Sequence, residues 1–322
     1  MKILITGGAG FIGYHLVKQL IERGHEVIIY DAFLNYIDPE KSTYDRYLKM
    51  RLEYLKEKTT IIRGDIRHKV TLFNTMRDVQ PEVVVHLAAL PISTVSNKFS
   101  EDAIDINLNG TTNVLESIRM TPSVKKFVYT SSSMVYGNFQ KPTADESHTT
   151  NPIDVYGATK LSGELLTRAY GKQYDIQYSI IRPSAVYGPT DCNRRVSQIF
   201  LENILSGTPI TLHNEGESKL DFTYVDDLAQ GFRLVVESEK SNGETFNITY
   251  GEGRSLKDFV NLLKDLLGKD AEINYKPADM KRPERGSLDV TKAKKLLGYK
   301  PENPLEVGLK KYVEFVKTYA KI

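Results

Sequence analysis

The chain has 322 residues, and its 43 Lys or Arg residues nearly cancel its 41 Asp or Glu residues, for a formal net charge of +2. That length suits a large domain with a smaller one, and the charge gives no basic footprint for nucleic acid. No apolar stretch is long enough to predict a membrane span, and the N-terminal apolar run is too short for a secretion signal. Because the single cysteine, Cys192, cannot form an internal disulfide, we expect a cytoplasmic protein.

Short apolar runs alternate with amphipathic stretches through the first 180 residues. A parallel strand that is covered on both faces is continuously apolar, so these runs predict buried strands. The predicted strands are Lys2–Thr6, Glu26–Asp31, Thr60–Arg63, Glu82–His86, Lys126–Thr130 and Gln177–Arg182. Helices are expected between them, for example over Phe11–Arg23, Ala103–Met120 and Val155–Gly171. This alternation predicts an α/β fold with a Rossmann-type, doubly wound parallel sheet.

The connection from Ala32 to Lys58 is unusually long and is rich in Tyr, Lys and Arg. Its second part, Lys41–Lys56, has the pattern of an amphipathic, solvated helix. Insertions of this length often carry function.

The pattern changes after residue 188, where segments become shorter and more mixed. We expect residues 1–188 to form a dinucleotide-binding domain and residues 189–322 a smaller mixed α/β substrate-binding domain. Helices are predicted over Arg194–Ser206, Val225–Glu237, Leu256–Leu267 and Leu305–Tyr319. Two later segments, Asp226–Val236 and Phe246–Ile248, are candidates to return to the first sheet.

A glycine-rich turn directly follows the first strand and opens a helix. Glycines permit a tight turn and close approach of a pyrophosphate, and the helix N-terminus offers free N–H groups to the phosphates. This context, rather than the motif alone, predicts a dinucleotide site. The cofactor-binding residues expected in the turn are Gly7, Gly10, Phe11, Ile12 and Gly13.

Asp31 ends the second strand, at the distance where an acidic residue accepts hydrogen bonds from the ribose hydroxyls. Its carboxylate would repel a 2′-phosphate, and the next residues supply no arginine, so we expect NAD rather than NADP. Residues after the third and fourth strands are further candidates for cofactor contact. These residues are Asp65, Ile66, Leu87, Ala88 and Ala89.

Tyr156 and Lys160 lie four residues apart on a predicted helix, so their side chains share one face. A free tyrosine has a pKa of about 10, which a neighbouring ammonium group lowers. Such a phenol can take a proton from a substrate hydroxyl while a hydride leaves the same carbon. Ser132 lies just beyond the fifth strand, where its hydroxyl can donate to the reacting oxygen.

These residues resemble the extended short-chain dehydrogenases, in particular the NAD-dependent nucleotide-sugar epimerases and dehydratases. The resemblance covers nearly the whole chain. Its markers are TGGAGFIG, Asp31, GDI, HLAA, Asn107 in NLNGTTNVLE, SSSMVYG, YGATK, RPSAVYGP, DFTYVDDLAQG and LDVTKAKKLLGYKP.

The resemblance implies a role for each site residue. Tyr156 would be the catalytic base, Lys160 would hold the cofactor ribose, and Ser132 would be the catalytic hydroxyl. Asn107 and Pro183 would belong to the cofactor site, with Pro183 beside the nicotinamide. Residues expected at the nucleotide sugar are Ser133, Met134, Ala185, Arg194, Lys219 and Arg282, of which Arg282 matches the arginine that binds the diphosphate. The resemblance also implies a homodimer formed through two helices of the first domain.

Within the family, the segment from Asn35 to Pro39 resembles the UDP-glucuronate 4-epimerases. An epimerase of this kind oxidises C4 of the sugar, lets the 4-keto ring turn over, and returns the hydride to the opposite face. The 4,6-dehydratases have an acidic residue at the position of Met134, and a thioether cannot move the proton that water elimination needs. This difference favours the epimerase.

Three departures from the family pattern, Ala185, Leu220 and the Glu284-Arg285 pair, fall where the nucleotide sugar is held. Alternatives therefore stay open: a nucleotide-sugar dehydrogenase or reductase, an epimerase of GDP-, CDP- or dTDP-sugars, a 4,6-dehydratase, or an NAD-sensing protein without catalysis. His86 is interpreted as a core histidine, and the histidines and Cys192 show no metal-binding spacing.

Overall fold

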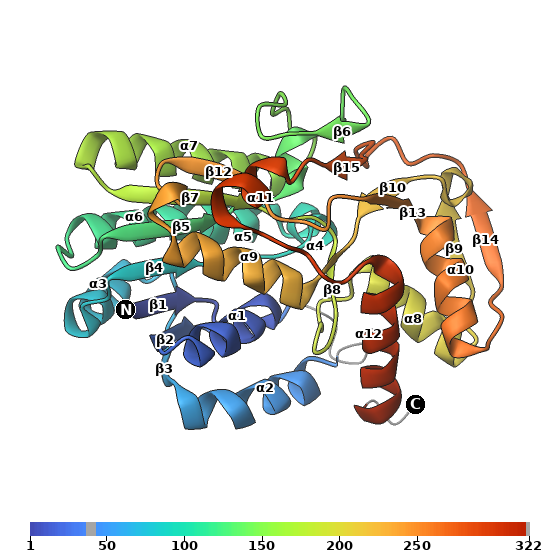
Figure 1. Ribbon diagram of the computed structural model, residues 1–322, viewed down its shortest axis with the longest axis horizontal. Coiled ribbons are helices and arrows are strands. Elements are labelled where there is room, and N and C mark those ends of the chain that lie inside the picture. The colour runs from blue at the N-terminus through green and yellow to red at the C-terminus, as the bar shows by residue number, and fades with distance from the viewer. Residues whose placement is uncertain (37–42, 320–322) are drawn as a thin grey trace.

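The computed structural model describes residues 1–36 and 43–319 and contains a central sheet of seven parallel strands (Figure 1). The strand order is β12-β7-β5-β4-β1-β2-β3. Their bounds are β1 Lys2–Thr6, β2 Glu26–Asp31, β3 Thr60–Arg63, β4 Val83–His86, β5 Lys126–Thr130, β7 Gln177–Arg182 and β12 Glu244–Asn247. The order reverses between β1 and β4, and ligands bind at such a switch point in open α/β sheets.

Helices cover both faces of this sheet because its buried strands are apolar in both directions. In β1, Ile3 and Ile5 pack into the core on one face, whereas Leu4 packs on the other. The first face is covered by α1 (Phe11–Glu22), α2 (Tyr44–Lys58) and α9 (Val225–Glu237). The second face is covered by α3 (Lys69–Val79), α6 (Thr111–Arg119) and α7 (Val155–Tyr174). The doubly wound sheet predicted from the sequence is confirmed.

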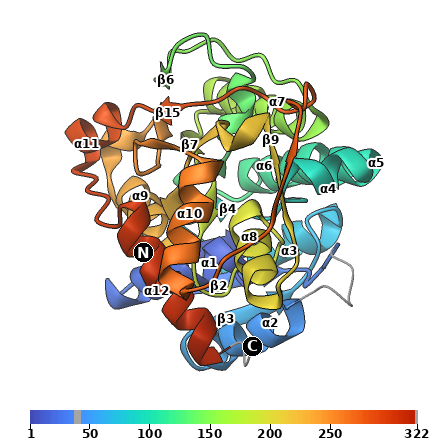
Figure 2. The ribbon, with the colours of Figure 1, turned by 90° about the vertical axis from the view of Figure 1, so that its right-hand side faces the viewer.

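A second, smaller group of elements lies beyond the carboxyl ends of the strands (Figures 1 and 2). Its separate apolar core is formed largely by α8 (Val196–Ser206), α10 (Leu256–Leu267) and α12 (Leu305–Tyr319). Its strand pairs are β9 (Ile210–His213) with β14 (Ile273–Lys276), and β10 (Lys219–Asp221) with β13 (Gly253–Ser255). The remaining elements are α4 Ser93–Lys98, α5 Ser100–Ile104, β6 Thr143–Ala144, β8 Val186–Tyr187, β11 Thr223–Tyr224, β15 Ser287–Leu288 and α11 Thr291–Leu297.

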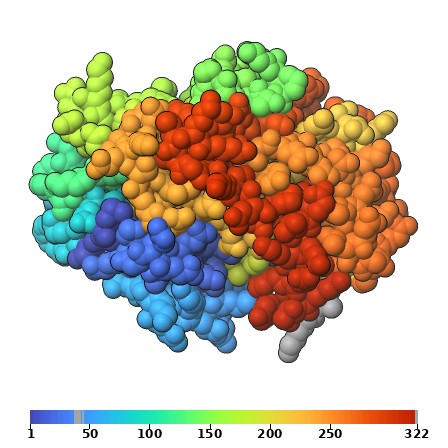
Figure 3. Space-filling view, in the orientation of Figure 1, coloured from blue at the N-terminus to red at the C-terminus, as the bar shows by residue number. Residues whose placement is uncertain are grey.

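Two segments after residue 188 return to the large sheet, as their apolar patterns suggested. β12 pairs in parallel with β7, and α9 packs against α1. Figure 3 shows residues near the C-terminus, in red, lying across the surface between the blue N-terminal part and the orange segment. Residue 188 is therefore not a boundary of the large sheet, and the division into two domains there stays a prediction.

Two predicted helices differ from the observed ones. The stretch Ala103–Met120 is not one regular helix, because α5 and α6 are joined by a π-helical turn over Asp105–Gly110. The Oγ1 of Thr111 donates to the carbonyl oxygen of Asn107 within this region. The helix predicted from Arg194 begins at Val196, because Arg194 has a φ of +51° and Arg195 is extended.

The insertion helix predicted over Lys41–Lys56 is observed over Tyr44–Lys58, and residues 37–42 lie outside the described part of the chain. Its amphipathic character is confirmed, because one face is exposed to solvent and the other is buried. Tyr47, Arg51 and Leu55, at a spacing of four, are buried against the rest of the protein. Among the described residues, no helix combines the length and the hydropathy needed to cross a membrane.

The return of α9 to the sheet predicts a non-additive pair of substitutions. A Cβ at Gly231 would lie 2.1 Å from Cγ2 of the buried Ile248. Gly231→Ala should therefore lower the free energy of unfolding by roughly 1–3 kcal/mol, despite alanine's higher helix propensity. In the Ile248→Ala background the same change should cost much less, as urea unfolding of the four proteins would show. Equal costs in both backgrounds would contradict this packing.

Candidate functional site

One large cavity, of about 1110 Å³, opens at the carboxyl ends of the parallel strands. It exceeds the roughly 300–1,000 Å³ typical of a pocket for one drug-sized ligand. Nearly all residues proposed from the sequence line it. They are Gly7, Gly10, Phe11, Ile12, Gly13, Asp31, Asp65, Ile66, Leu87, Ala88, Ala89, Ser132, Ser133, Met134, Tyr156, Lys160, Pro183, Ala185, Arg194, Lys219 and Arg282. The cavity thus brings the proposed cofactor, catalytic and substrate residues together.

The glycine turn has the geometry that a dinucleotide requires. Gly7 has a φ of +72°, and a Cβ there would lie 2.6 Å from the backbone nitrogen of Ala88. A Cβ at Gly13 would lie 2.6 Å from the carbonyl oxygens of Gly7 and Gly8. Within the described chain α1 has no side-chain cap and no acidic residue in its first turn. Its N-terminus therefore presents partial positive charge to an anion in the cavity.

Asp31 closes the other side of this turn. Its Oδ2 accepts a hydrogen bond from the backbone N–H of Ala9 at 3.0 Å, and its Oδ1 accepts one from Phe33 at 2.8 Å. Burial raises the pKa of Asp31, while these two N–H groups and the charge of Arg51 oppose the rise. The carboxylate is thus held at the end of β2, where a ribose would meet it.

Asp65 and Asn107 have their side chains engaged within the protein. Asp65 forms a short ion pair with Arg67, at 2.7 Å, at the edge of the cavity. Asn107 is not among the residues that line the cavity, and its assignment to the cofactor site stays a prediction. Its Oδ1 accepts from the backbone of Leu90, and its Nδ2 donates to Oγ1 of Thr159. These bonds join the segment after β4 to α7.

Helix α7, which carries Tyr156 and Lys160, begins at a side-chain cap. Asp154 accepts a hydrogen bond from the backbone N–H of Gly157 at 2.7 Å, which fixes the first turn. One turn further, Lys160 donates to the carbonyl oxygen of Thr130 at 2.9 Å, and its ammonium lies 5.9 Å from the centre of the Tyr156 ring. The neighbouring positions predicted from the i, i+4 spacing are confirmed.

Burial shifts the pKa values of both Tyr156 and Lys160. It lowers the pKa of Lys160 to about 8. It raises the pKa of Tyr156, and the charge of Arg195 and a hydrogen bond with Ser132 oppose that rise. Positive charge in this part of the cavity therefore favours the phenolate form that can act as a base.

Ser132, Ser133 and Met134 form the loop and 3₁₀ turn after β5. The Ser132 hydroxyl accepts the N–H of Met134 at 3.2 Å, and the Ser133 N–H donates to the carbonyl oxygen of Pro183. All three side chains are buried and line the cavity. They supply two hydroxyls and a thioether but no carboxyl group.

Sequence reasoning missed the buried carboxylate of Glu164, which is 1% exposed, behind this loop. Its oxygens accept hydrogen bonds from Ser131 at 2.6 Å and from Arg182 at 2.8 and 2.7 Å. Arg168 adds a further bond at 3.0 Å. Glu164 lies four residues after Lys160 on the same helix, and this spacing in the sequence could have indicated that its side chain shares the face of Lys160. Glu164 thereby fixes α7 to the ends of β5 and β7.

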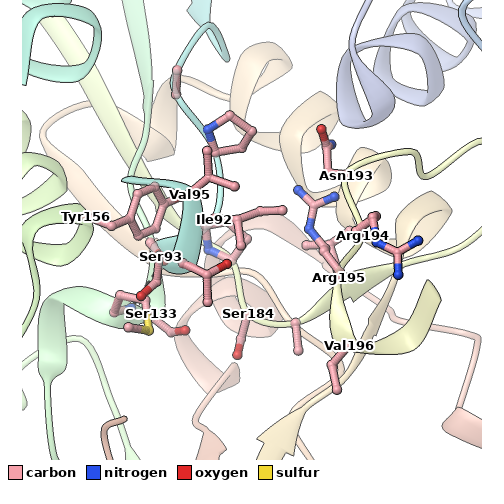
Figure 4. A pocket seen from close by; sticks show the side chains of 18 of the residues that line it. Ile92, Ser93, Val95, Ser133, Tyr156, Ser184, Asn193, Arg194, Arg195 and Val196 are labelled. Carbon is pink, nitrogen blue, oxygen red and sulfur yellow. Dashed lines mark hydrogen bonds between the residues drawn. The ribbon is translucent and has the colours of Figure 1, made fainter. Parts of the chain in front are cut away.

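Two further segments line the cavity, one around Ile92 and the other from Asn193 to Val196 (Figure 4). In this view Tyr156 and Ser133 lie on one side, and Arg194 and Arg195 on the other, with Ile92 between them. Ile92 has a φ of +73°, a strained value for a β-branched residue that is typical of functional sites.

The two arginines of the second segment are both held by carboxylates. Arg195 pairs with the buried Asp191 at 2.6 Å, and Arg194 pairs with Glu202 at 2.8 Å. These pairs orient the guanidinium groups beside the cavity.

Three basic residues from the C-terminal part also line the cavity. Lys219 and Arg282 are exposed, and Arg282 pairs with Asp279 at 3.1 Å. Burial lowers the pKa of Arg285 to about 10, opposed by the charge of Asp154. Its Nε is buried without a hydrogen-bond partner in the described chain. Arg285 is thus a second candidate, beside Arg282, for binding a diphosphate.

His86 is confirmed as a core residue. Its ring nitrogens lie 2.7 Å from Oγ1 of Thr6 and 3.0 Å from Oγ1 of Thr111. Burial lowers its pKa to about 3, and the charge of Lys160 adds to this effect, so the ring is neutral. Within the described part of the chain, no group of three or more His, Cys, Asp or Glu residues is placed to hold a metal ion.

Comparison with known proteins agrees with this geometry. Residues 3–249 match the model of the NAD dependent epimerase/dehydratase family, and the chain belongs to that family. It is 34% identical to Protein CapI of Staphylococcus aureus over all of both chains.

Two solved structures are similar over 99% of both chains. UDP-glucuronic acid 4-epimerase of Bacillus cereus, in complex with UDP-glucuronic acid and NAD, has a TM-score of 0.90 and 31% identity. UDP-glucose 4-epimerase of Thermotoga maritima, with UDP-glucose, has a TM-score of 0.88 and 33% identity. The resemblance inferred from the sequence motifs is confirmed at the level of the family.

The buried ammonium of Lys160 predicts a pH-dependent cost in stability. Because its folded-state pKa is about 8, the unfolded chain binds one more proton than the folded chain between about pH 8 and 10.5. Stability from this group is therefore lowest below pH 8 and rises towards pH 10.5. Lys160→Met should be more stable than the nucleotide-free wild type at pH 7, and this advantage should shrink by about 3 kcal/mol by pH 10.5.

Urea unfolding of nucleotide-free protein at pH 7, 8.5 and 10 measures this difference. Both proteins share every other titrating group, so the comparison isolates Lys160. A difference between them that is independent of pH would contradict the depressed pKa.

Proposed function

We propose that the protein is an NAD-dependent UDP-sugar 4-epimerase, with UDP-glucuronate as its first candidate substrate. The observation that carries this proposal is the arrangement of Ser132, Tyr156 and Lys160 beside the glycine turn in one cavity. The family and the two solved epimerases support the same reaction. The long insertion after β2 supports the glucuronate substrate, as the resemblance in Asn35–Pro39 suggests.

Each of these residues has a role in the steps of an epimerisation. The Tyr156 phenolate takes the proton of the C4 hydroxyl, while Ser132 donates a hydrogen bond to the same oxygen. Bound NAD supplies the hydride acceptor and then the hydride donor at C4. The Lys160 ammonium holds the ribose and favours the phenolate. After the 4-keto sugar turns over, Tyr156 returns its proton to the C4 oxygen, and the hydride adds to the opposite face of C4.

Two cofactor features follow from the residues present. The glycine turn and the α1 N-terminus would hold the pyrophosphate, and Asp31 would accept the ribose hydroxyls. Because the reaction is redox-neutral overall, tight retention of the dinucleotide is an advantage. Met134 and its neighbours offer no acid for elimination, which supports epimerisation over dehydration.

We also propose a homodimer through the helices α6 and α7. Leu165 on α7 is 61% exposed, and Met120, next to the end of α6, is 55% exposed. Apolar residues on neighbouring helices suit a self-complementary interface. A cytoplasmic location stays a prediction from the sequence.

The substrate proposal predicts a specific conversion. Incubation with UDP-glucuronate should produce UDP-galacturonate, visible by NMR of the anomeric protons, without net formation of NADH. UDP-glucose, GDP-, CDP- and dTDP-sugars tested in parallel decide the alternatives. If another UDP-sugar were converted and UDP-glucuronate were not, the proposed substrate would be wrong but the reaction would stand. Net release of NADH would indicate a dehydrogenase. Absence of C4 conversion with every sugar would refute the epimerase.

Replacing the base gives a second test. Tyr156→Phe keeps the ring and removes the hydroxyl, so kcat should fall roughly 10²- to 10⁴-fold. Bound dinucleotide, measured after heat release, should stay near the wild-type amount because Lys160 and the glycine turn are unchanged. Ser162→Ala, a change at a partly exposed position of the same helix, serves as the control. Near-normal kcat in Tyr156→Phe would show that another group is the base.

A further inference from the structure

Arg51, on the insertion helix α2, is a buried cation with few partners. Its side chain is 1% exposed, and its Nη1 donates to the carbonyl oxygen of Thr190 at 2.8 Å. Its other contacts are to the sulfur of Cys192, at 3.7 and 3.8 Å. Its Nε has no hydrogen-bond partner in the described chain. Sulfur is a weak acceptor, and a buried guanidinium normally has its donors satisfied by stronger ones.

Arg51 is placed to act on the start of α1 and the end of β2. It lines the same cavity as Gly10 and Phe11, which begin α1. Its charge acts on both Asp31 and Tyr14, which lie at the end of β2 and in the first turn of α1. Arg195 approaches from the other loop, with its Cζ 5.4 Å from the centre of the Phe11 ring. Arg195 therefore lies at the start of α1, and the charge of Arg51 acts on the same region.

That start is chemically suited to an anion. α1 has twelve residues, and within the described chain it lacks both a side-chain cap and an acidic residue in its first turn. Its N–H groups and the helix dipole favour negative charge there. A guanidinium donates to phosphate oxygens through several N–H groups in a fixed fork. A pyrophosphate at this helix would give Nε and Nη2 of Arg51 the strong acceptors that the described residues do not supply.

We propose that Arg51 binds the pyrophosphate of the dinucleotide and so makes the insertion helix α2 part of the cofactor site. This inference rests on the proposed use of NAD. It gives the long connection after β2 a function of its own, the retention of the cofactor between turnovers. A purely structural role would instead confine Arg51 to holding Thr190 and Cys192 in place.

The test compares ligands that share adenosine but differ in phosphate. Dissociation constants of NAD, ADP-ribose and adenosine are measured on nucleotide-free wild type and Arg51→Met, with adenosine followed by competition. We expect the substitution to raise the dissociation constants of NAD and ADP-ribose by roughly ten- to hundredfold and to leave that of adenosine unchanged. Arg51→Met should also lose more NAD than wild type during purification.

Two further variants sharpen the result. Lys49→Met removes the same charge from an exposed position of α2 and should leave all three constants unchanged. Arg51→Lys keeps the charge but loses the fork, so NAD and ADP-ribose should weaken by less than in Arg51→Met. If Arg51→Met fails to fold, Arg51→Lys alone should still weaken the two phosphate ligands relative to adenosine.

The outcomes separate this inference from the proposed function. Equal weakening of adenosine, or unchanged binding of NAD, would overturn the role of Arg51. If the wild type did not bind NAD, both the proposed use of NAD and the proposed role of Arg51 would be refuted. Tight binding of NAD without C4 conversion would refute the epimerase and leave Arg51 to be judged by its own constants.

Discussion

The buried carboxylate of Glu164 joins the three elements that carry the chemistry. It is on α7, one turn beyond Lys160, and it accepts hydrogen bonds from Ser131 after β5 and from Arg182 at the end of β7. A buried carboxylate is tolerated only when it is paired and its oxygens are fully hydrogen-bonded. This requirement makes the positions of α7 and the two strand ends interdependent. Tyr156 and Lys160 are thereby fixed on a helix, and Ser132 lies next to Ser131, whose hydroxyl bonds to the same carboxylate.

The rest of the site follows from the same edge of the sheet. Parallel strands direct their carboxyl ends to one side, so the glycine turn, Asp31 and Ser132 meet there although they are far apart in sequence. The smaller C-terminal group closes this edge and adds Lys219, Arg282 and Arg285 to the cavity. The residues proposed for the redox step thus lie at the sheet edge and on α7, whereas Lys219, Arg282 and Arg285, proposed for the nucleotide sugar, come from later segments.

Sequence patterns predicted most of the sheet and of the redox site because both depend on local rules. Continuous apolar runs identified six of its strands, and the i, i+4 spacing placed Tyr156 beside Lys160. Features set by tertiary contacts were missed. Arg51 resembles a solvated charge in its helix pattern, and only the fold shows that Thr190 and Cys192 cover it. The resemblance places Asn107 at the cofactor, and only the fold shows that its amide also bonds to Leu90 and Thr159.

The central claim is that one bound dinucleotide oxidises C4 and returns the same hydride. The fate of the C4 hydrogen tests it most directly. With UDP-glucuronate deuterated at C4, the account predicts that the product carries its deuterium at C4 and that none appears in solvent, as NMR and mass spectrometry would show. Product formed with hydrogen from solvent at C4 would contradict hydride return and would require a different mechanism for inverting that centre.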